Sequence, residues 1–282
     1  MSPTLGMVAR PLVQVPTEYG SEATPQGWWT EWPSGLVDVS RTSHLPPASD
    51  GAQVEPPPLT AALLDISVDG DRVVRVKRES TAMVIIDMQN FFLHPELRDH
   101  PTGLKCVDPL MKTLPVLRNA GIKILWVNWG LTETELSTIP PSLVRGFMKN
   151  GRGGFGSEMP GGFGRLLMRD AKNSELYGPL QPAFVKGRDD GTDFWIHKNR
   201  MSGLWGYQSA LDLFLQENGI TTLLFSGVNA DQCVQGTLVD AYFRGYDCIL
   251  VKDATATTSP TGGYENVSYG FVTDSARLLA MR

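Results

Sequence analysis

Residues 223–244 read LLFSGVNADQCVQGTLVDAYFR, and this stretch predicts a strand that leads directly into a helix. The apolar run Leu223–Phe225 has the length of a buried strand, and Ser226 and Gly227 follow it as a turn. The apolar residues after the turn recur at helical spacing: Val234, Leu238, Ala241 and Tyr242. A strand, a tight turn and a helix in this order are typical of α/β proteins.

One cysteine of this stretch, Cys233, falls in the first turn of the predicted helix. Asp231 stands just before it, at the place of an N-cap or first-turn acid. The positive end of a helix dipole favours a thiolate at such a position, and backbone N–H groups there can hold an oxyanion. A free cysteine is more usually a small buried apolar residue, so position alone leaves both interpretations open.

Four more segments are predicted as strands, and they lie at 82–87, 123–128, 194–198 and 247–253. The segment 82–87 is a continuous apolar run that ends in an acid, as expected for a strand buried on both faces of a parallel sheet. The alternation of strands with helices predicts a three-layer α/β/α fold. Its sheet is mostly parallel and Rossmann-like, with about six strands.

Helices are predicted at 107–120 and 207–218, and each ends at a glycine, Gly121 or Gly219. Near the end of the chain, residues 270–272 predict a short sixth strand. Either Thr273 or Asp274 then caps a last helix.

The first 77 residues differ from the rest, because prolines are dense and short apolar pieces are separated by turn residues. Three tryptophans, Trp28, Trp29 and Trp32, are too many large aromatic residues for a disordered tail. Residues 69–77 alternate after Gly70, which predicts a turn and an edge strand. We therefore expect an N-terminal extension at 1–77 that covers either the domain at 78–282 or a neighbouring subunit.

Composition restricts the partners and the compartment of the chain. The formal net charge of −5 argues against nucleic acid or an anionic membrane as the main partner, and no apolar run is long enough to span a bilayer. Three separated cysteines, without a Cys/His cluster, indicate a reducing compartment, and the first residues lack the pattern of a signal peptide. The sequence thus predicts a cytoplasmic protein.

Residues 145–166 are rich in glycine, and 151–156 match the pattern G-x-G-x-x-G. No buried strand leads into this match and no clear helix follows it, although a dinucleotide-binding motif needs both. We interpret the segment as a surface loop, with a lid as the functional alternative.

Three reactive groups, Asp87, Lys198 and Cys233, follow or end predicted strands. Ligand crevices of open parallel sheets lie at the carboxyl ends of their strands, so we expect the three groups to lie close together. A carboxylate near a thiol can accept its proton, and an ammonium group keeps that carboxylate ionised. Taken singly, Asp87 is equally explained as a turn cap and Lys198 as a strand-end lysine that reaches solvent.

These residues resemble the signatures of the isochorismatase-like cysteine hydrolases. The resemblance covers roughly residues 78–280 and rests on VIIDMQNFF at 84–92, on Lys198, and on GVNADQCV at 227–234. It implies a catalytic triad of Asp87, Lys198 and Cys233. It also implies a cis peptide bond between Val228 and Asn229 that turns a backbone N–H toward the substrate oxygen.

The resemblance also allows a prediction about a metal site. Nicotinamidases of this family carry a metal site with histidines after the second strand, whereas residues 128–135 contain no histidine. Since His94, His100 and His197 lack metal-ligand spacing, we interpret them as surface or packing residues and expect no metal and no cofactor. The segments 198–205 and 126–129 resemble ureidoacrylate amidohydrolases and related carbamoyl-amide hydrolases.

The predicted function is metal-free, cysteine-dependent hydrolysis of a small amide, ureido or carbamoyl C–N bond through a thioester. Two alternatives are hydrolysis of the vinyl ether of isochorismate and a non-catalytic binding protein on the same scaffold. Arg200 is a candidate partner for a substrate carboxylate, and we expect a homo-oligomer, a dimer or a tetramer. The predicted substrate-binding residues, for which simple packing is the competing explanation, are Phe92, Asn128, Trp129, Arg200, Trp205, Tyr207 and Gln232.

Overall fold

The computed structural model describes residues 10–23, 26–45, 55–148, 153–258 and 271–281. Its central sheet has six strands in the order β11-β10-β9-β6-β7-β8, and every neighbouring pair is parallel. The strands are β6 (Thr81–Ile86), β7 (Lys123–Trp129), β8 (Asp193–Lys198), β9 (Thr222–Val228), β10 (Asp247–Ala256) and β11 (Phe271–Thr273).

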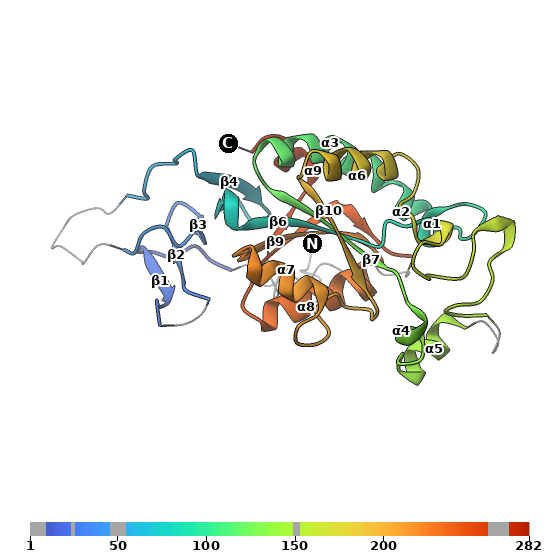
Figure 1. Ribbon diagram of the computed structural model, residues 1–282. Coiled ribbons are helices and arrows are strands. Elements are labelled where there is room, and N and C mark those ends of the chain that lie inside the picture. The colour runs from blue at the N-terminus through green and yellow to red at the C-terminus, as the bar shows by residue number, and fades with distance from the viewer. Residues whose placement is uncertain (1–9, 24–25, 46–54, 149–152, 259–270, 282) are drawn as a thin grey trace, which may run out of the picture.

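Helices cover both faces of this sheet (Figure 1). On one face lie α3 (Val107–Asn119), α6 (Leu180–Asp189) and α9 (Ser275–Leu279), and on the other lie α7 (Ala210–Glu217) and α8 (Gln235–Phe243). All residues of β6 and β9 are buried, because a strand between two helical layers has no solvent-facing side. The predicted three-layer α/β/α fold with its parallel sheet is therefore confirmed.

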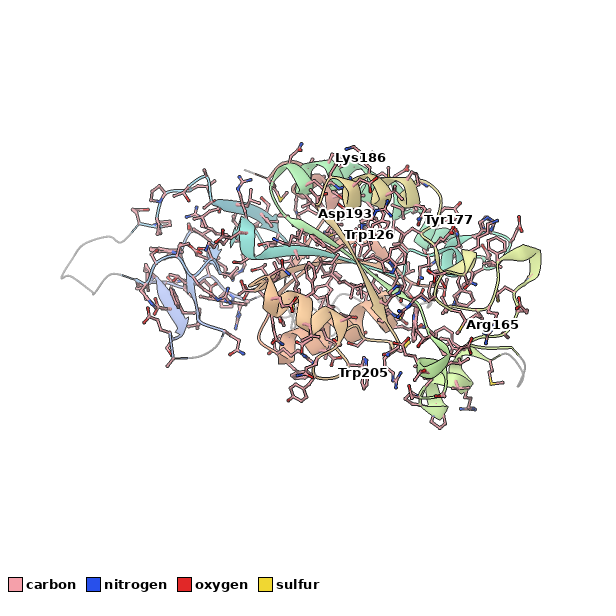
Figure 2. All side chains as sticks on the ribbon, viewed as in Figure 1. Trp126, Arg165, Tyr177, Lys186, Asp193 and Trp205 are labelled. Carbon is pink, nitrogen blue, oxygen red and sulfur yellow. The ribbon has the colours of Figure 1, made fainter. Side chains whose placement is uncertain are left out.

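A buried carboxylate joins the sheet to helix α3 through hydrogen bonds on the face covered by α3 and α6. Figure 2 shows Trp126 of β7 close to Asp193, the first residue of β8, and the indole Nε1 donates to Asp193 Oδ2 at 2.8 Å. Arg118 of α3 donates to both oxygens of the same carboxylate, at 2.8 and 2.6 Å. This buried acid is thus fully paired, as a charge inside a core must be.

Helix ends depart from the predicted ranges where side chains cap them. The predicted helix at 207–218 begins at Ala210, because Ser209 accepts the N–H of Asp212 and Gln208 has a φ of 58°, outside the helical region. Asp274 caps α9 by accepting the N–H of Arg277 at 2.9 Å, one of the two predicted caps. The predicted sixth strand is present as β11, although Gly270 lies outside the described residues.

The N-terminal extension forms a second sheet of five strands in the order β1-β2-β3-β5-β4. Its strands are β1 (Thr17–Gly20), β2 (Trp28–Glu31), β3 (Leu36–Asp38), β4 (Leu63–Val68) and β5 (Arg72–Lys77). The prediction of an edge strand at 69–77 is wrong, because β5 pairs with β4 on one side and with β3 on the other. Alternation in the sequence marks a strand, but it carries no information on how many neighbours pair with it.

The extension packs against the main sheet through a buried ion pair. Arg41 donates from Nη1 and Nη2 to the two oxygens of Asp247, each at 2.7 Å, and Asp247 is fully buried at the start of β10. Trp29 of β2 donates its indole N–H to the same carboxylate at 2.8 Å. We propose the unit boundary after Lys77, where β5 ends and the chain enters the main sheet through β6.

Candidate active site

The acid of the site, Asp87, directly follows β6 and is completely buried. Its φ is 53°, in the left-handed region that costs a residue with a side chain about 1–2 kcal/mol. The backbone N–H of Trp129, at the end of the neighbouring strand β7, donates to Asp87 Oδ1 at 3.3 Å. This contact from β7, together with Lys198 Nζ of β8 at 2.9 Å from Asp87 Oδ2, holds the carboxylate in one orientation.

The candidate nucleophile, Cys233, is placed by a tight turn after β9. Gly227 has a φ of 112°, and a Cβ there would lie 2.0 Å from the carbonyl oxygen of Ile86, so only glycine fits against β6. The Val228–Asn229 bond is cis, in agreement with the expected geometry. Cys233, 2% exposed, lies in a π-helical turn (Ala230–Val234) that precedes α8, instead of in the first turn of the α-helix itself.

Lys198, the last residue of β8, joins the other two groups. Its Nζ lies 2.9 Å from Asp87 Oδ2 and 3.5 Å from Cys233 Sγ. The same ammonium donates to the carbonyl of Arg200 at 3.2 Å and lies 3.9 Å from the centre of the Trp129 ring. The structure thus brings the three predicted residues together in one buried cluster, with an aromatic face beneath the cation.

Burial and charge act in opposite directions on the titratable groups of this cluster. Burial raises the pKa of the Cys233 thiol to about 12, an effect that the nearby charge of Lys198 opposes. Burial therefore also opposes the effect of the helix start, which favours a thiolate. Burial also raises the pKa of Asp87, while the charge of Lys198 lowers it. The raised pKa of Cys233 favours its thiol form, so a thiolate forms there only with the help of a base.

The turn that follows the cis bond offers a backbone donor. No hydrogen-bond acceptor for the N–H of Asn229 is found among residues 10–258 wherever they are described, whereas its carbonyl accepts the N–H groups of Gln232 and Val234. The side chain of Asn229 is fixed by His100, at 2.7 Å from Nε2 to Oδ1. Because Nδ1 of His100 accepts the N–H of Gly103 at 2.9 Å, Nε2 carries the proton and donates.

Two residues of the site were missed in the sequence. His100 was interpreted as a surface or packing residue, yet it is completely buried and orients Asn229. Gln89 accepts the N–H of Trp129 at 3.1 Å and donates to the carbonyls of Trp129 and Ser174 at 2.8 and 2.7 Å. The signal for Gln89 was its place in the quoted motif, two residues after Asp87, whereas nothing in the sequence connects His100 with Asn229.

The predicted substrate-binding residues fall into an inner and an outer group. Phe92, Asn128 and Trp129 are at most 2% exposed and lie on α1 (Asn90–Leu93) and at the end of β7. Both amide atoms of Asn128 are buried without a hydrogen-bond partner in the described part of the chain, whereas the side chain of Trp129 hydrogen-bonds with Cys233. Asn128 therefore keeps a donor and an acceptor for a ligand.

The outer group lies on loops at the rim. Trp205 is 51% exposed, and Figure 2 shows it at the outer edge of the molecule. It donates to Asn199 at 3.0 Å, and the guanidinium of Arg200 stacks 4.6 Å from its ring. The side chain of Gln232 is exposed. The prediction for Tyr207 is wrong, because this side chain is 96% exposed and stacks with Arg244, so it forms no wall of a buried site.

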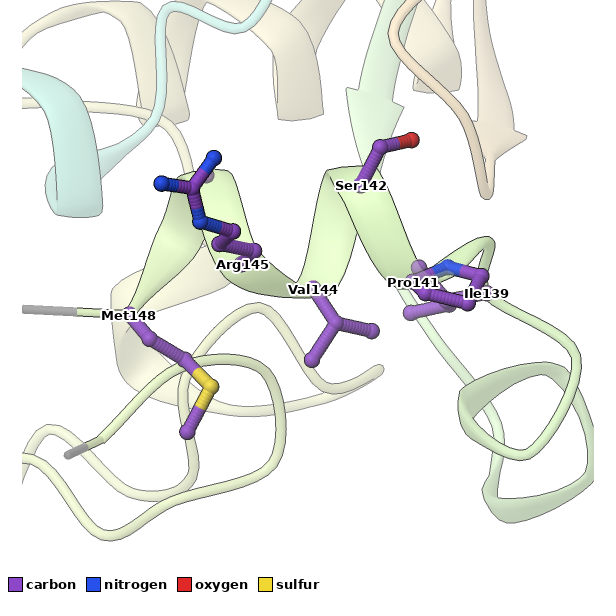
Figure 3. A pocket seen from close by; sticks show the side chains of 7 residues that line it. Ile139, Pro141, Ser142, Val144, Arg145 and Met148 are labelled. Carbon is purple, nitrogen blue, oxygen red and sulfur yellow. The ribbon is translucent and has the colours of Figure 1, made fainter. Parts of the chain in front are cut away.

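Part of the glycine-rich segment covers the site with aromatic rings. Phe147, the last residue of α5 (Pro141–Phe147), and Phe155 stack with ring centres 4.2 Å apart, and both lie against Trp129. A hollow of about 910 Å³ lies along α5 and is lined by residues between Ile139 and Met148, and Asp87, Lys198 and Cys233 are not among them. Figure 3 shows the side chains that line it. Residues 151 and 152 of the G-x-G-x-x-G match lie outside the described residues.

The residues after β7 do not fit a metal site. In α4 (Glu133–Leu136), Glu133 pairs with Arg165, and Glu135 closes a capping box with Thr132 and accepts from Asn199 at 2.9 Å. Across the described ranges, no three His, Cys, Asp or Glu side chains are grouped to hold a metal ion. Within the same ranges, no helix is both long and apolar enough to cross a bilayer.

The known proteins that are similar in sequence to this chain include ureidoacrylate amidohydrolases of two organisms. The ureidoacrylate amidohydrolase RutB of Caulobacter segnis is 29% identical over 193 residues, which are 66% of this chain and 77% of that protein. RutB of Methylorubrum extorquens is 26% identical over 210 residues, 70% of this chain and 81% of that protein.

Solved structures share the fold. The N-carbamoylsarcosine amidase of Thermoplasma acidophilum has a TM-score of 0.53 and 28% identity, and covers 70% of this chain and 96% of that one. Nicotinamidase PncA of Bacillus subtilis has a TM-score of 0.52 at 22% identity, covering 69% and 99%, and shows the fold alone. The family model described as the isochorismatase domain matches residues 81–269, more than half of the 282 residues. This chain therefore belongs to the isochorismatase family of hydrolases.

Proposed function

We propose that this protein is a cysteine hydrolase that cleaves the C–N bond of a small amide, ureido or carbamoyl compound without a metal ion. The observation that carries the proposal is the buried contact of Lys198 Nζ with both Asp87 Oδ2 and Cys233 Sγ. It unites a proton acceptor, a nucleophile and a fixed positive charge in one desolvated cluster. The names of the relatives, ureidoacrylate amidohydrolase and N-carbamoylsarcosine amidase, support the same class of bond.

In the first half of the reaction the thiol becomes an acyl thioester. The carboxylate of Asp87 accepts the Sγ proton while the sulfur of Cys233 bonds to the carbonyl carbon, and the C=O π electrons move onto oxygen. The N–H groups of Asn229 and Cys233 donate to this oxyanion, and one such donor is worth about 3–4 kcal/mol in other enzymes. The oxyanion collapses, the C–N bond breaks, and Asp87 returns its proton to the departing nitrogen.

In the second half water releases the product. Asp87 accepts a proton from a water molecule as the water oxygen bonds to the thioester carbon. Collapse of the second oxyanion breaks the C–S bond, and Cys233 recovers the proton from Asp87. An amide yields a carboxylic acid by this route, and a ureide that loses ammonia yields a carbamic acid.

Lys198 keeps Asp87 ionised in spite of its burial. The ammonium opposes the effect of desolvation on the pKa of Asp87, which without it would favour the neutral acid. The centre of the Trp129 ring lies 3.9 Å from Nζ, and its π electrons stabilise the cation. Lys198 therefore acts through Asp87 and Cys233, without a proton transfer of its own.

The buried amide of Asn128 is compatible with a C–N substrate. Both its donor and its acceptor atoms lack partners in the described residues, although leaving a buried polar group unpaired costs about 1–3 kcal/mol. A carbamoyl or amide group offers both N–H and C=O, which complement the two ends of this side chain.

The test is ammonia release from a panel of amides, ureides and carbamoyl compounds, with isochorismate consumption followed in parallel. We expect Cys233→Ala to abolish ammonia release and Asp87→Asn to lower kcat/KM by about 10²–10⁴-fold. Unchanged ammonia release by Cys233→Ala would contradict the proposal. Consumption of isochorismate without any release of ammonia would instead show that the protein hydrolyses a vinyl ether.

A further inference from the structure

The hydroxyl group of Thr237 in α8 joins the turn of the candidate nucleophile to the loop after β8, residues 199–209. Thr237 is completely buried, and its Oγ1 donates to the carbonyl of Cys233 at 2.7 Å. The same oxygen accepts the backbone N–H of Gly203 at 3.0 Å. One side chain therefore connects two segments that come from different parts of the chain.

The loop that Thr237 holds also contacts the thiol directly. Met201 Sδ lies 3.8 Å from Cys233 Sγ, and Lys198 Nζ, at the start of the same loop, lies 3.5 Å from it. The ammonium of Lys198 also donates to the carbonyl of Arg200 at 3.2 Å. A shift of this loop relative to the turn would therefore change both contacts of the sulfur.

The peptide of Gly203, to which Thr237 bonds, is itself closely held. Its carbonyl accepts the hydroxyl of Ser209, the N-cap of α7, at 2.7 Å. A Cβ added to Gly203 would lie 3.0 Å from the side chains of Leu211 and Val127. Thr237 thus bonds to a part of the loop that has little room to move.

A helical threonine commonly donates to the carbonyl four residues before it, and this bond alone needs no function. Thr113 in α3 is such a case. It is completely buried, and its Oγ1 lies 2.9 Å from the carbonyl oxygen of Pro109 and 3.1 Å from that of Leu110, both in its own helix. Thr237 differs because its second hydrogen bond comes from another element, next to the candidate nucleophile.

We infer that Thr237 is a positioning residue that fixes Cys233 Sγ relative to Lys198 Nζ by holding the turn and the loop together. Attack on a carbonyl carbon depends closely on geometry, and a displacement of about 1 Å can cost about 10²-fold in rate. Thr237 acts through Cys233 and touches no reacting atom in this role. The inference rests on the proposed cysteine mechanism and adds one residue to it.

The kinetic test replaces the hydroxyl and keeps the shape. We expect Thr237→Val to lower kcat by about 10–100-fold with KM little changed, because the nucleophile is displaced while no contact to the substrate is removed. Thr237→Ser keeps the hydroxyl and should retain most of kcat. Thr113→Val is the matched control, since it also loses a buried helical hydroxyl, and its kcat should equal that of the wild type. Each rate is divided by the folded fraction of the same sample, which urea unfolding measures.

Hydrogen exchange tests the connection without any substrate. Thr237→Val removes the acceptor of the Gly203 N–H, so exchange in peptides that cover residues 199–205 should be faster by about 5–10-fold, the factor for one ordinary hydrogen bond. Thr237→Ser and Thr113→Val should leave this exchange as in the wild type.

Three results would overturn the role of Thr237 while leaving C–N hydrolysis intact. They are unchanged exchange in Thr237→Val, a wild-type kcat in Thr237→Val, and a loss of kcat in Thr237→Ser as large as in Thr237→Val. Absence of Cys233-dependent ammonia release from every compound would instead overturn the proposed function, and the exchange experiment would still show whether Thr237 joins the two segments.

Discussion

At the scale of single residues, the cluster of Asp87, Lys198 and Cys233 balances burial against charge. Desolvation alone would neutralise both Asp87 and Cys233, and the single ammonium of Lys198 opposes it for each of them. In the proposed mechanism Cys233 is therefore a thiol beside the carboxylate of Asp87, and its proton moves as the substrate is attacked. This order of events follows from the burial of the three side chains.

The first prediction concerns pH. As the pH falls through the pKa of Asp87, this residue takes up a proton and can no longer accept one from Cys233, so kcat/KM is lost on the acid side. Because burial raises this pKa, we expect the midpoint to lie above the ordinary value of 3.8. Lys198→Met removes the largest influence that lowers the pKa, so its midpoint should move to still higher pH. A midpoint at lower pH in Lys198→Met would contradict the assignment of Asp87.

The second prediction concerns the turn before the nucleophile. Gly227→Ala places a Cβ 2.0 Å from the carbonyl oxygen of Ile86 at a φ of 112°, so we expect a loss of about 2–4 kcal/mol in unfolding free energy and a lower kcat. Gly219→Ala is the control, since its φ of 59° is also positive but nothing lies within 4 Å of the added Cβ. Urea unfolding measures both, and equal losses would show that φ alone decides the effect.

At the scale of elements, the strands that carry the triad were predictable because each is an apolar run followed by a reactive residue. The rule that parallel strands present their carboxyl ends at one edge then placed Asp87, Lys198 and Cys233 together. The exact start of α7 and the π-helical turn around Cys233 were not predictable, since they depend on a local cap and on contact with Ile86.

The other errors depend on contacts between distant segments. His100 and Asn229 are 129 positions apart, and the sequence offers no sign that they meet. Tyr207 was placed at the site because it follows β8 closely, but the loop turns it outward to 96% exposure.

The third prediction concerns the loop that begins α2 (Pro101–Leu104). His100→Leu removes the donor to Asn229 Oδ1, so we expect kcat to fall by about tenfold, as for one hydrogen bond of ordinary strength, with KM little changed. Steady-state kinetics and thermal unfolding separate this positioning role from a loss of stability. His44→Leu, a change on the extension at a half-exposed histidine, is the control and should alter neither constant. A change in KM alone would argue against the positioning of Asn229.

At the scale of the whole molecule, the extension is part of the fold. Its sheet shares a continuous apolar core with the main sheet, to which Val39, Ile66 and Val74 contribute, and all three are completely buried. The Arg41–Asp247 pair lies at the amino end of β10, whereas Asp87, Lys198 and Cys233 lie at or after the carboxyl ends of β6, β8 and β9. The extension therefore stabilises the sheet at the amino ends of its strands, on the side opposite to the candidate active site.

The fourth prediction tests this role. Asp247 is fully buried, so Arg41→Ala leaves its carboxylate without its charged partner, and we expect a loss of about 3–5 kcal/mol in the free energy of unfolding. Arg277→Ala breaks an ion pair with Asp69 whose side chains are 32% and 41% exposed, and should cost at most about 1 kcal/mol. Similar losses in the two variants would show that the extension is not anchored by Asp247.

In the proposed mechanism the sulfur of Cys233 carries an acyl group, and hydroxylamine can trap this intermediate. The enzyme is run on its best substrate with increasing hydroxylamine, and the product is analysed by mass spectrometry. A thioester predicts that hydroxylamine competes with water and yields the hydroxamate, or the hydroxyurea from a ureide, with wild type but not with Cys233→Ala. Ammonia release that yields only the water-derived product at every hydroxylamine concentration would contradict a covalent intermediate on Cys233.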